Sequence, residues 1–557
     1  MVTGQFRRSL PGAGGTTARY GAPDECHRTG PPGGAPSAWA PLRIAAFRSL
    51  WLAVLASNIG AWMQTVGAQW LLVDEPGATT LVALVQTASM LPVLLLALPA
   101  GALADTFDRR RLLIAVQTFL FLVGLVLTVL TAAGRMPPAL LLGLTFALGV
   151  GQALTLPAWQ AVIPELVPRP QLQSASALGS ISINLARAVG PAIAGVLVAQ
   201  AGVAVVFAVN AASFLIFTLV LLRWRAPRRT GGDSPERFLA ALRAGGRYAR
   251  HSPVVRRILL RAALFIVPGT ALWALLPLVA SARLGLGSSG YGLLLAALGV
   301  GAVAGAVVLP RLRARLSASQ LLLAAGLVFG AALLVVGAVP RPVLVTVALV
   351  PAGMAWLTVL SSVNASMQLF LPGWVRARGM SMWQIVFAGG QALGALAWGA
   401  LAQATDLVVA HVAAGALMLA GAATIRWWPL REVGHLDRAP AVYWPEPHLT
   451  LDPDRRVGPV LVTVSYPVRP EREAEFVAAM QVVRRSRQRT GASRWGLYRS
   501  GEQPDRFVEV YQVPSWGEHL RQHGGRMTGA DRAAEERARA LADGEPEVTH
   551  LLPARPD

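Results

Sequence analysis

The chain has 557 residues, of which 54% are hydrophobic and 14% are charged, and its mean hydropathy is +0.49. Ordinary soluble domains carry about 25% charged residues, so this composition excludes a chain that is soluble throughout. The formal net charge of +21 would suit a nucleic-acid-binding protein. The positions of the arginines along the chain decide whether the charge has that role.

The N-terminal residues 1–40 are rich in Gly and Pro and contain no apolar run typical of a signal peptide. We therefore expect a disordered extension there. The single cysteine, Cys26, excludes an internal disulfide.

Apolar windows of about 20 residues dominate the next part of the chain, and such windows are long enough for helices that cross a bilayer. The sequence therefore predicts an all-α polytopic membrane protein with twelve transmembrane helices, embedded in the lipid bilayer. The windows are 47–72, 81–104, 112–133, 139–162, 175–199, 204–223, 258–281, 290–310, 319–338, 343–368, 380–402 and 408–428.

The arginines concentrate in alternate loops between these windows. Between Arg223 and Arg261 there are eleven Arg against Asp233 and Glu236. By the positive-inside rule these loops are cytoplasmic. An even number of spans puts both termini in the cytoplasm as well, and we expect the protein to lie in the plasma membrane. The basicity is thus a topology signal, and we expect no nucleic-acid partner. The other basic loops hold Arg109 to Arg111, Arg169, Arg311 to Arg315, and Arg376 with Arg378, whereas the opposite loops hold Arg135, Arg283 and Arg341 with Asp74, Glu75 and Asp406.

Two pairs of segments indicate an internal repeat. GALADTFDRRR from Gly101 aligns with GAVVLPRLRAR from Gly305, and WQAVIPELVPR from Trp159 aligns with MQLFLPGWVRA from Met367. The offsets, 204 and 208 residues, agree closely, as expected for a duplicated six-helix unit. The predicted boundaries are a bundle at 41–223, a basic linker at 224–257 and a second bundle at 258–428.

These motifs resemble the major facilitator superfamily. Its loop signature of a Gly, an acid and a basic cluster is matched by Gly101, Asp105, Arg110 and Arg111, although Thr106 and Asp108 depart from it. The segments SNIGAWMQTVGAQW, PAWQAVIPELVPR and NLARAVGPAIAG further resemble the enterobactin-exporter-like branch. The resemblance implies a secondary transporter that exports a small organic molecule, a siderophore or drug-like metabolite, by alternating access with a proton as the coupling ion.

The charged segment from Gly101 to Arg111 is expected to form a latch at the cytoplasmic mouth. The carboxylate of Asp105 can face the positive N-terminal end of the helix that starts near Arg378. Asp105 and Arg109 are four apart and can pair on one helical face. The alternative is that Arg109, Arg110 and Arg111 only anchor the topology. The repeat has Leu309 at the acid position, so the latch is one-sided.

Arg187 is the main candidate for contact with cargo, because an ionisable residue in the middle of a span is costly and usually functional. Ser180, Asn184, Arg187 and Pro191 recur at helical spacing. The adjacent Gly190, Pro191 and Gly195 resemble the Gly-Pro motif of drug–proton antiporters and are expected to permit close helix approach; the alternative is that they serve packing alone.

Polar stripes occur on four other spans, which the resemblance implies line the central cavity. For any single member, a hydrogen bond between helices is an equal alternative. We find no carboxylate in mid-span, so proton coupling rests on the resemblance alone. The candidates are Asn58, Trp62, Thr65 and Gln69, then Gln152, Thr155 and Trp159, then Ser361, Asn364 and Gln368, then Gln384 and Gln391.

A second domain is predicted at 458–557, after a Pro-rich linker at 429–457. Alternating strands (VLVTVSYPV, WGLYRS, RFVEVYQV, EVTHLL) and amphipathic helices resemble the ferredoxin-like α+β fold of small dimeric proteins related to antibiotic-biosynthesis monooxygenases, which implies self-association. His519 and His523, four apart, have a spacing that suits a metal, but no third ligand is evident, and we interpret them as packing histidines. We expect no cofactor and no enzyme; the rival hypothesis is a membrane-anchored enzyme or sensor whose active part is this domain.

Overall fold

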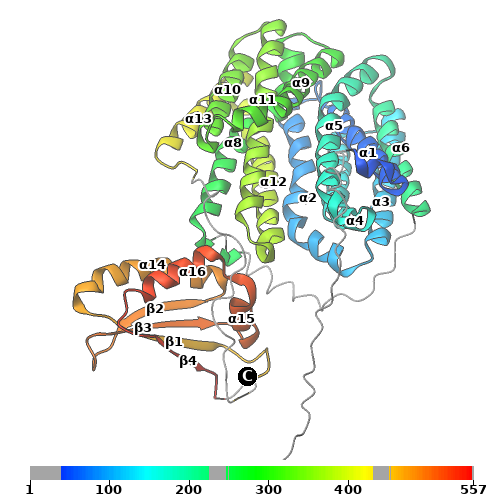
Figure 1. The fold of residues 1–557 in the computed structure, drawn as a ribbon. Helices are drawn as coiled ribbons and strands as arrows, with labels where there is room; N and C mark the ends of the chain where they lie inside the picture. The colour runs from blue at the N-terminus through cyan, green and yellow to red at the C-terminus, as the bar shows by residue number, and fades with distance from the viewer. Residues whose placement is uncertain (1–38, 225–245, 249, 431–450, 452, 555–557) are drawn as a thin grey trace, which may run out of the picture.

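The computed structural model describes residues 39–224, 246–248, 250–430, 451 and 453–554. The predicted N-terminal extension and most of the two linkers lie outside these residues. Figure 1 shows a bundle of long helices with a smaller α+β unit, called the tail below, at one end of it.

The first half of the bundle consists of six helices and the second half repeats the pattern. Between the two halves, Ser252 accepts a hydrogen bond from the amide of Val255 and so caps the first helix of the second half. The first six are α1 (Ala45–Leu71), α2 (Ala78–Thr106), α3 (Arg109–Ala132), α4 (Pro138–Leu166), α5 (Leu172–Ala201) and α6 (Val203–Arg223). The second six are α8 (Pro253–Leu278), α9 (Ser288–Arg313), α10 (Ala318–Ala338), α11 (Pro342–Phe370), α12 (Gly373–Ala404) and α13 (Leu407–Ala423).

Among the described residues, eleven helices are long and apolar enough to cross a membrane. The remaining long helix, α1, has 27 residues, and polar residues such as Asn58 and Gln64 reduce its mean hydropathy. Two helix boundaries differ from expectation. The eleventh predicted helix begins at Gly373, not near Arg378, because Pro372 directly precedes it and fits a helix start.

The second boundary that differs is the interruption of the helix between α2 and α3, just before the three arginines. The second helix ends at Thr106 and the third begins at Arg109, because the carboxylate of Asp108 accepts a hydrogen bond from the amide of Arg111 and caps α3. The expectation that Asp105 and Arg109 share one helical face is therefore wrong.

The two halves meet along α2 with α12 and α5 with α9. We call the end of the bundle that carries Arg109–Arg111 and Arg311–Arg315 the basic end. Several hydrogen bonds between the halves lie toward the opposite end: Gln86 donates to the Oε1 of Gln391 (2.9 Å), and Gln69 bonds to the carbonyl of Trp273 (3.2 Å) and the hydroxyl of Tyr291 (2.7 Å). The halves are thus tied together at the opposite end.

The tail is a four-stranded antiparallel sheet in the order β2-β3-β1-β4. In Figure 1, α14 and α16 cover the face of the sheet that is turned toward the bundle. Alternate residues of β1, such as Val462 and Val464, point into the resulting core, where they meet Phe476 and Met480. The elements are β1 (Val460–Pro467), α14 (Glu473–Thr490), β2 (Arg494–Arg499), β3 (Arg506–Val513), α15 (Trp516–Arg521), the π-helical turn η6 (Gln522–Arg526), α16 (Gly529–Arg539) and β4 (Glu547–Leu551).

The tail contacts the basic end of the bundle at Trp374 of α12 and at the segment before α8, where Arg247 also pairs with Glu518 (3.8 Å). The indole nitrogen of Trp374 donates to the carbonyl of Arg526 (3.2 Å), and the Arg526 guanidinium lies over the Trp374 ring, 4.8 Å from its centre. The ring of Tyr248 packs edge-on against Trp374, and the guanidinium of Arg489 lies over Tyr248. We call Trp374, Arg526, Tyr248 and Arg489 the docking contact.

Candidate functional site

Arg187 lies on α5, partly buried, with its guanidinium over the ring of Trp62 from α1, 5.4 Å from the ring centre. A cation over an indole face is attracted to it, but the ring accepts no full hydrogen bond. The Nε of Arg187 is buried and has no hydrogen-bond partner among the described residues. The side chain therefore offers a charged donor that the described residues leave unused.

Trp62 begins a chain of aromatic rings that crosses from one half of the bundle to the other. Its ring lies 5.6 Å from that of Trp273 on α8, and Trp273 lies 5.3 Å from Trp356 on α11. The indole nitrogens of Trp273 and Trp356 are buried, and neither has a hydrogen-bond partner among the residues that the structure describes. Trp356 also packs against Phe265 and Phe329, so the chain of rings runs from Trp62 into the core of the second half.

Sequence reasoning found Trp62 but missed Trp273 and Trp356. An indole inside an apolar window carries no polar signal, and most such residues only pack. A search for tryptophans near the middle of corresponding helices in the two halves would have found both.

Several polar residues predicted to line the cavity bond to neighbouring helices. Gln69 and Gln391 are buried and form the ties between the halves described above. The side chain of Asn58 donates to the hydroxyl of Ser182 on α5 (3.1 Å). These three residues therefore use polar atoms in contacts between helices.

Trp159 is buried against Phe217, whereas other predicted cavity residues keep more exposure. The amide of Asn184 bonds to the carbonyl of Ser180 on its own helix, and that of Gln368 bonds to Asn364 (3.0 Å). Gln152 is exposed and Gln384 is partly exposed.

The latch segment has partners that the sequence did not suggest. Arg109 pairs with Glu165 at the end of α4 (2.7 Å) and donates to the carbonyl of Ala161 (2.8 Å). Arg110 donates to the carbonyls of Leu221 and Leu222 near the end of α6, where unpaired helical carbonyls favour a cation. These arginines join α3 to α4 and α6. Gly101 and Asp105 lie in α2, but their surroundings are outside what the structure describes.

The Gly-Pro motif lies where helices approach closely. A Cβ at Gly190 would lie 2.8 Å from the Cβ of Trp62, and one at Gly195 would lie 2.8 Å from the Cα of Gly292 on α9. Pro191 lies between them, inside α5. Gly195 and Gly292 thus bring backbones of the two halves together.

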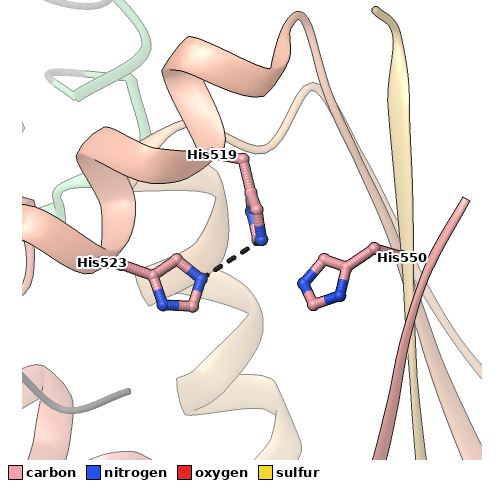
Figure 2. A group of neighbouring side chains, drawn as sticks. All are labelled: His519, His523 and His550. Atoms are coloured by element: carbon pink, nitrogen blue, oxygen red, sulfur yellow. Dashed lines mark hydrogen bonds between the residues drawn. The ribbon is translucent and has the colours of Figure 1, made fainter. Parts of the chain in front are cut away.

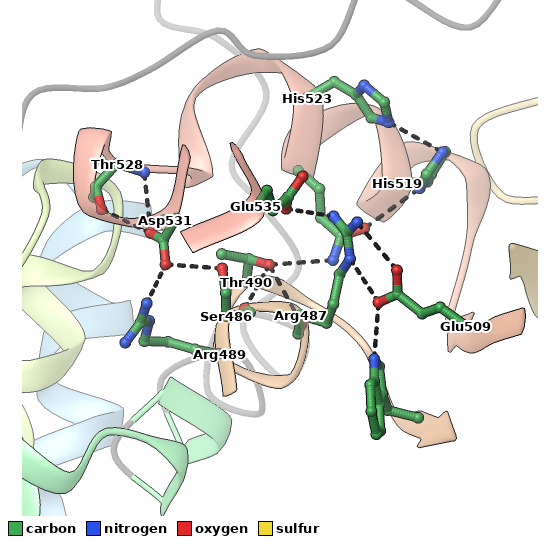
Figure 3. A network of polar contacts seen from close by, with 12 residues as sticks. Ser486, Arg487, Arg489, Thr490, Glu509, His519, His523, Thr528, Asp531 and Glu535 are labelled. Atoms are coloured by element: carbon green, nitrogen blue, oxygen red, sulfur yellow. Dashed lines mark hydrogen bonds and ion pairs between the residues drawn. The ribbon is translucent and has the colours of Figure 1, made fainter. Parts of the chain in front are cut away.

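The tail contains a second group of polar side chains between its sheet and helices. Arg487 pairs with Glu509 (3.1 Å) and with Glu535 (2.8 Å), and all three are buried (Figure 3). Burial alone would lower the pKa of Arg487, but the two carboxylates raise it well above its usual range. The guanidinium is therefore charged, and it is held in place by Glu509 on β3 and Glu535 on α16.

Close to this network, His519 and His523 face a third histidine, His550 on β4 (Figure 2). The Nε2 atoms of His519 and His523 are 3.2 Å apart. Burial, followed by the neighbouring His523 and His550, lowers the pKa of His519 to about 3, so this imidazole is neutral at physiological pH. The sequence did not indicate His550 as a third ligand, because it lies on the strand β4 and only the fold brings that strand next to α15.

Comparison with known proteins places this geometry in context. The family model described as "Transmembrane secretion effector" matches residues 36–557. The staphyloferrin A transporter of Staphylococcus aureus (strain NCTC 8325 / PS 47) is 26% identical, over 50% of this chain and 70% of that protein. The enterobactin exporter EntS of Escherichia coli O1:K1 / APEC is 29% identical, over 58% and 77% respectively.

A more distant relative and two solved structures complete the comparison. Macrolide efflux protein A of Streptococcus pyogenes is 22% identical over 42% of this chain and 58% of that protein. The crystal structure of a bacterial homologue of the human lysosomal transporter Spinster, inward-facing and unoccupied, gives a TM-score of 0.53 at 15% identity, covering 70% of this chain and 95% of that one. An auto-inhibited POT family peptide transporter gives 0.56 at 13% identity, covering 70% and 97%.

Proposed function

Because this chain belongs to the transmembrane secretion effector family, whose relatives are major facilitator efflux transporters, we propose that it exports a small organic molecule of siderophore or drug-like type from the cell. It is a multi-pass membrane protein of a transporter family, and no enzyme is indicated. The direction of transport, the class of cargo and the residues that contact the cargo are the proposed part.

The single observation that carries the proposal is the pairing of Arg187 with the aromatic chain of Trp62, Trp273 and Trp356. A guanidinium with an unused donor suits a carboxylate, phenolate or catecholate oxygen. Indole rings beside it suit a flat or ring-containing cargo. Siderophores and many drug-like metabolites combine these two chemical features.

Alternating access is supported by the division of the bundle into two six-helix halves and by the hydrogen bonds that join these halves at the end opposite the basic end. We take the basic end as cytoplasmic by the positive-inside rule. The protein then crosses the plasma membrane twelve times, α1 included, and has both termini in the cytoplasm. On this assignment the hydrogen bonds of Gln69 and Gln391 lie toward the outer side and have to break before that side opens. Coupling to a proton is part of the proposal and rests on the family.

The tail is the second candidate for an active part. Its βαββαβ order and the strand order β2-β3-β1-β4 support a ferredoxin-like fold. The docking contact ties it to α12, which favours a regulatory part of the transporter over a separate enzyme. Self-association through the tail stays a prediction that no observation tests.

The test is export itself, measured in cells that lack the gene and in cells complemented with it. We expect complemented cells to retain less of an anionic catecholate siderophore and of at least one ring-containing antibiotic. Inside-out vesicles with an imposed proton gradient then test coupling. Equal retention of every candidate in the two strains, with the protein correctly inserted, would overturn the proposal.

A further inference from the structure

Three histidines in the tail point their rings at a common point. His519 lies in α15, His523 follows one turn later in η6, and His550 comes from β4 (Figure 2). A ring nitrogen of each lies within 4.8 Å of the others, and His519 is fully buried. We propose that His519, His523 and His550 bind one divalent transition-metal ion of the Zn²⁺ class, with a water in the fourth position. This inference does not depend on the exporter function.

The spacing of the first two nitrogens fits a metal ion. Zinc binds imidazole nitrogen at about 2.0–2.1 Å, so two ligands of a tetrahedral site are about 3.3 Å apart. The Nε2 atoms of His519 and His523 are 3.2 Å apart. The ring nitrogen of His550 lies at most 4.8 Å from those of the other two histidines. It has to move closer to them by at most about 1.5 Å to reach the tetrahedral spacing.

A hydrogen-bond relay orients His519 as a metal ligand. The side-chain amide of Gln522 donates to the hydroxyl of Thr490 (3.3 Å), which leaves its Oε1 facing the Nδ1 of His519 (3.3 Å). His519 therefore donates from Nδ1 and presents the lone pair of Nε2 to the other histidines. Metal-binding histidines are usually held in this way by a carbonyl or carboxylate oxygen.

His550 gives a second, independent indication. Its Nε2 is buried and has no hydrogen-bond partner among the described residues, an arrangement that is costly for a polar atom away from water. The ring packs edge-on against Trp516, which also contacts His519. Packing alone accounts for the position of the rings, but it leaves a nitrogen unused, whereas a metal site uses one nitrogen from each ring.

The ligand set also selects the class of metal. Three imidazoles with no oxygen ligand from the protein suit Zn²⁺, Cu²⁺ or Ni²⁺ and are unsuited to Mg²⁺ or Ca²⁺, which require several oxygen ligands. The tetrahedral spacing selects zinc among the first group. The aromatic neighbours Trp516 and Tyr511 enclose the site on the core side.

The experiment uses full-length protein in detergent, purified through a tag without histidine and carrying Cys26→Ser to remove the one thiol. After chelator treatment, Zn²⁺ is titrated in competition with a chromophoric chelator, and bound metal is counted by mass spectrometry after gel filtration. We expect one zinc per chain. Co²⁺ in its place should show the visible absorption of a four-coordinate ion and hyperfine-shifted imidazole proton signals in its NMR spectrum.

Substitutions then assign the ligands. His523→Gln and His550→Gln should each weaken zinc binding at least 10-fold, and Gln522→Leu, which removes only the orienting oxygen, should weaken it about 10- to 100-fold. His251→Gln, on the segment before α8, is the matched control and should bind as the parent does. The absence of stoichiometric zinc in the parent, or parent-like binding by the His523→Gln/His550→Gln double variant, would overturn the proposal. If a variant fails to fold, the stoichiometry and cobalt spectrum of the parent still decide it.

Discussion

Arg187 is the residue whose chemistry most directly limits what the bundle can carry. A guanidinium in mid-span costs roughly 2.5–3.5 kcal/mol on insertion scales. The stack on Trp62 offsets part of this, yet the described residues leave Nε without a partner. The sequence predicted a buried arginine without a partner, whereas its aromatic neighbours came only from the fold.

The first prediction concerns Arg187→Gln. Removing the charge should lower export of an anionic cargo about 10- to 100-fold, since a hydrogen bond to a charged group contributes about 1.5–3 kcal/mol. Export of a neutral cargo should change little. Arg187→Lys should restore part of the anionic export, because it keeps the charge without the planar fork.

Matched expression levels and one anionic and one neutral substrate are required for this comparison. Equal losses for both substrates would show that Arg187 serves folding or closure and does not bind cargo.

Asp531 provides a prediction on pH. Burial alone would raise the pKa of this carboxyl, but Arg489 and hydrogen bonds from Thr528 and Ser486 lower it below its ordinary value. A lowered folded-state pKa means that its stabilisation is present above the ordinary carboxyl value, about pH 3.9, and is lost as the pH falls through the folded pKa. The tail should therefore loosen in acid.

The variant Asp531→Asn isolates this effect. At pH 7 it leaves the guanidinium of Arg489 without its partner and should destabilise the tail by roughly 3–5 kcal/mol, seen as faster hydrogen exchange in α16. At a pH below the folded-state pKa of Asp531 the difference from wild type should shrink. Asp543→Asn, which breaks a more exposed pair with Arg469, should cost no more than about 1 kcal/mol. A difference for Asp531→Asn that is the same at both pH values would refute the linkage.

At the scale of elements, hydrophobic windows and turn residues predicted the helices and strands well. β1 and β3 were expected at VLVTVSYPV and RFVEVYQV and are found at Val460–Pro467 and Arg506–Val513. What the sequence could not supply were pairings between distant elements, such as Arg109 with Glu165, His550 with His519, or Trp374 with Arg526. Each depends on how two elements are brought together, and neither periodicity nor spacing along one element carries that information.

The approach of α5 to α9 provides a prediction for helix packing. A Cβ at Gly292 would lie 2.9 Å from the Cα of Gly195 and 3.0 Å from the carbonyl oxygen of Pro191, both backbone atoms that cannot yield cheaply. Gly292→Ala should therefore cost roughly 1–3 kcal/mol, lower the melting temperature in detergent and reduce export. Gly143→Ala, where a Cβ meets nothing within 4 Å, should change neither. Wild-type melting of Gly292→Ala would mean that the two helices do not need this contact.

The latch remains a proposal about α2 and α12. If Asp105 faces the N-terminal end of α12, Asp105→Asn should weaken closure of the cytoplasmic mouth and lower export, with expression nearly unchanged, since a carboxylate at a helix N-terminus contributes about 0.3–1 kcal/mol or more when partly buried. Export is measured beside Asp108→Asn, which alters the cap of α3 instead. Unimpaired export by Asp105→Asn would remove the latch from the mechanism.

At the scale of the whole molecule, the tail is tied to the second half of the bundle. Trp374 lies at the start of α12, and Tyr248 precedes α8. Trp374→Ala removes a cation–π contact and a hydrogen bond, together worth about 1–3.5 kcal/mol. Spin labels at Leu369→Cys and Tyr498→Cys, both exposed in the protein, should then give a broad distance distribution in place of a narrow one.

The exposed Trp427, which follows the short turn after α13, is the control, since Trp427→Ala should keep the distribution narrow. A distribution that stays narrow in Trp374→Ala would show that other contacts hold the tail in place.

The ties that join the halves at the opposite end have a consequence for how often that end opens. Four of these hydrogen bonds, from Gln69, Tyr291, Gln86 and Thr87, are between neutral groups. In membrane proteins such bonds contribute about 0.6 kcal/mol each, so together they supply roughly 2–3 kcal/mol. An equilibrium biased by that amount keeps the alternative conformer populated at a level on the order of 1%. The empty protein therefore samples its other face spontaneously, and a cargo that prefers one face by a few kcal/mol suffices to set which face predominates.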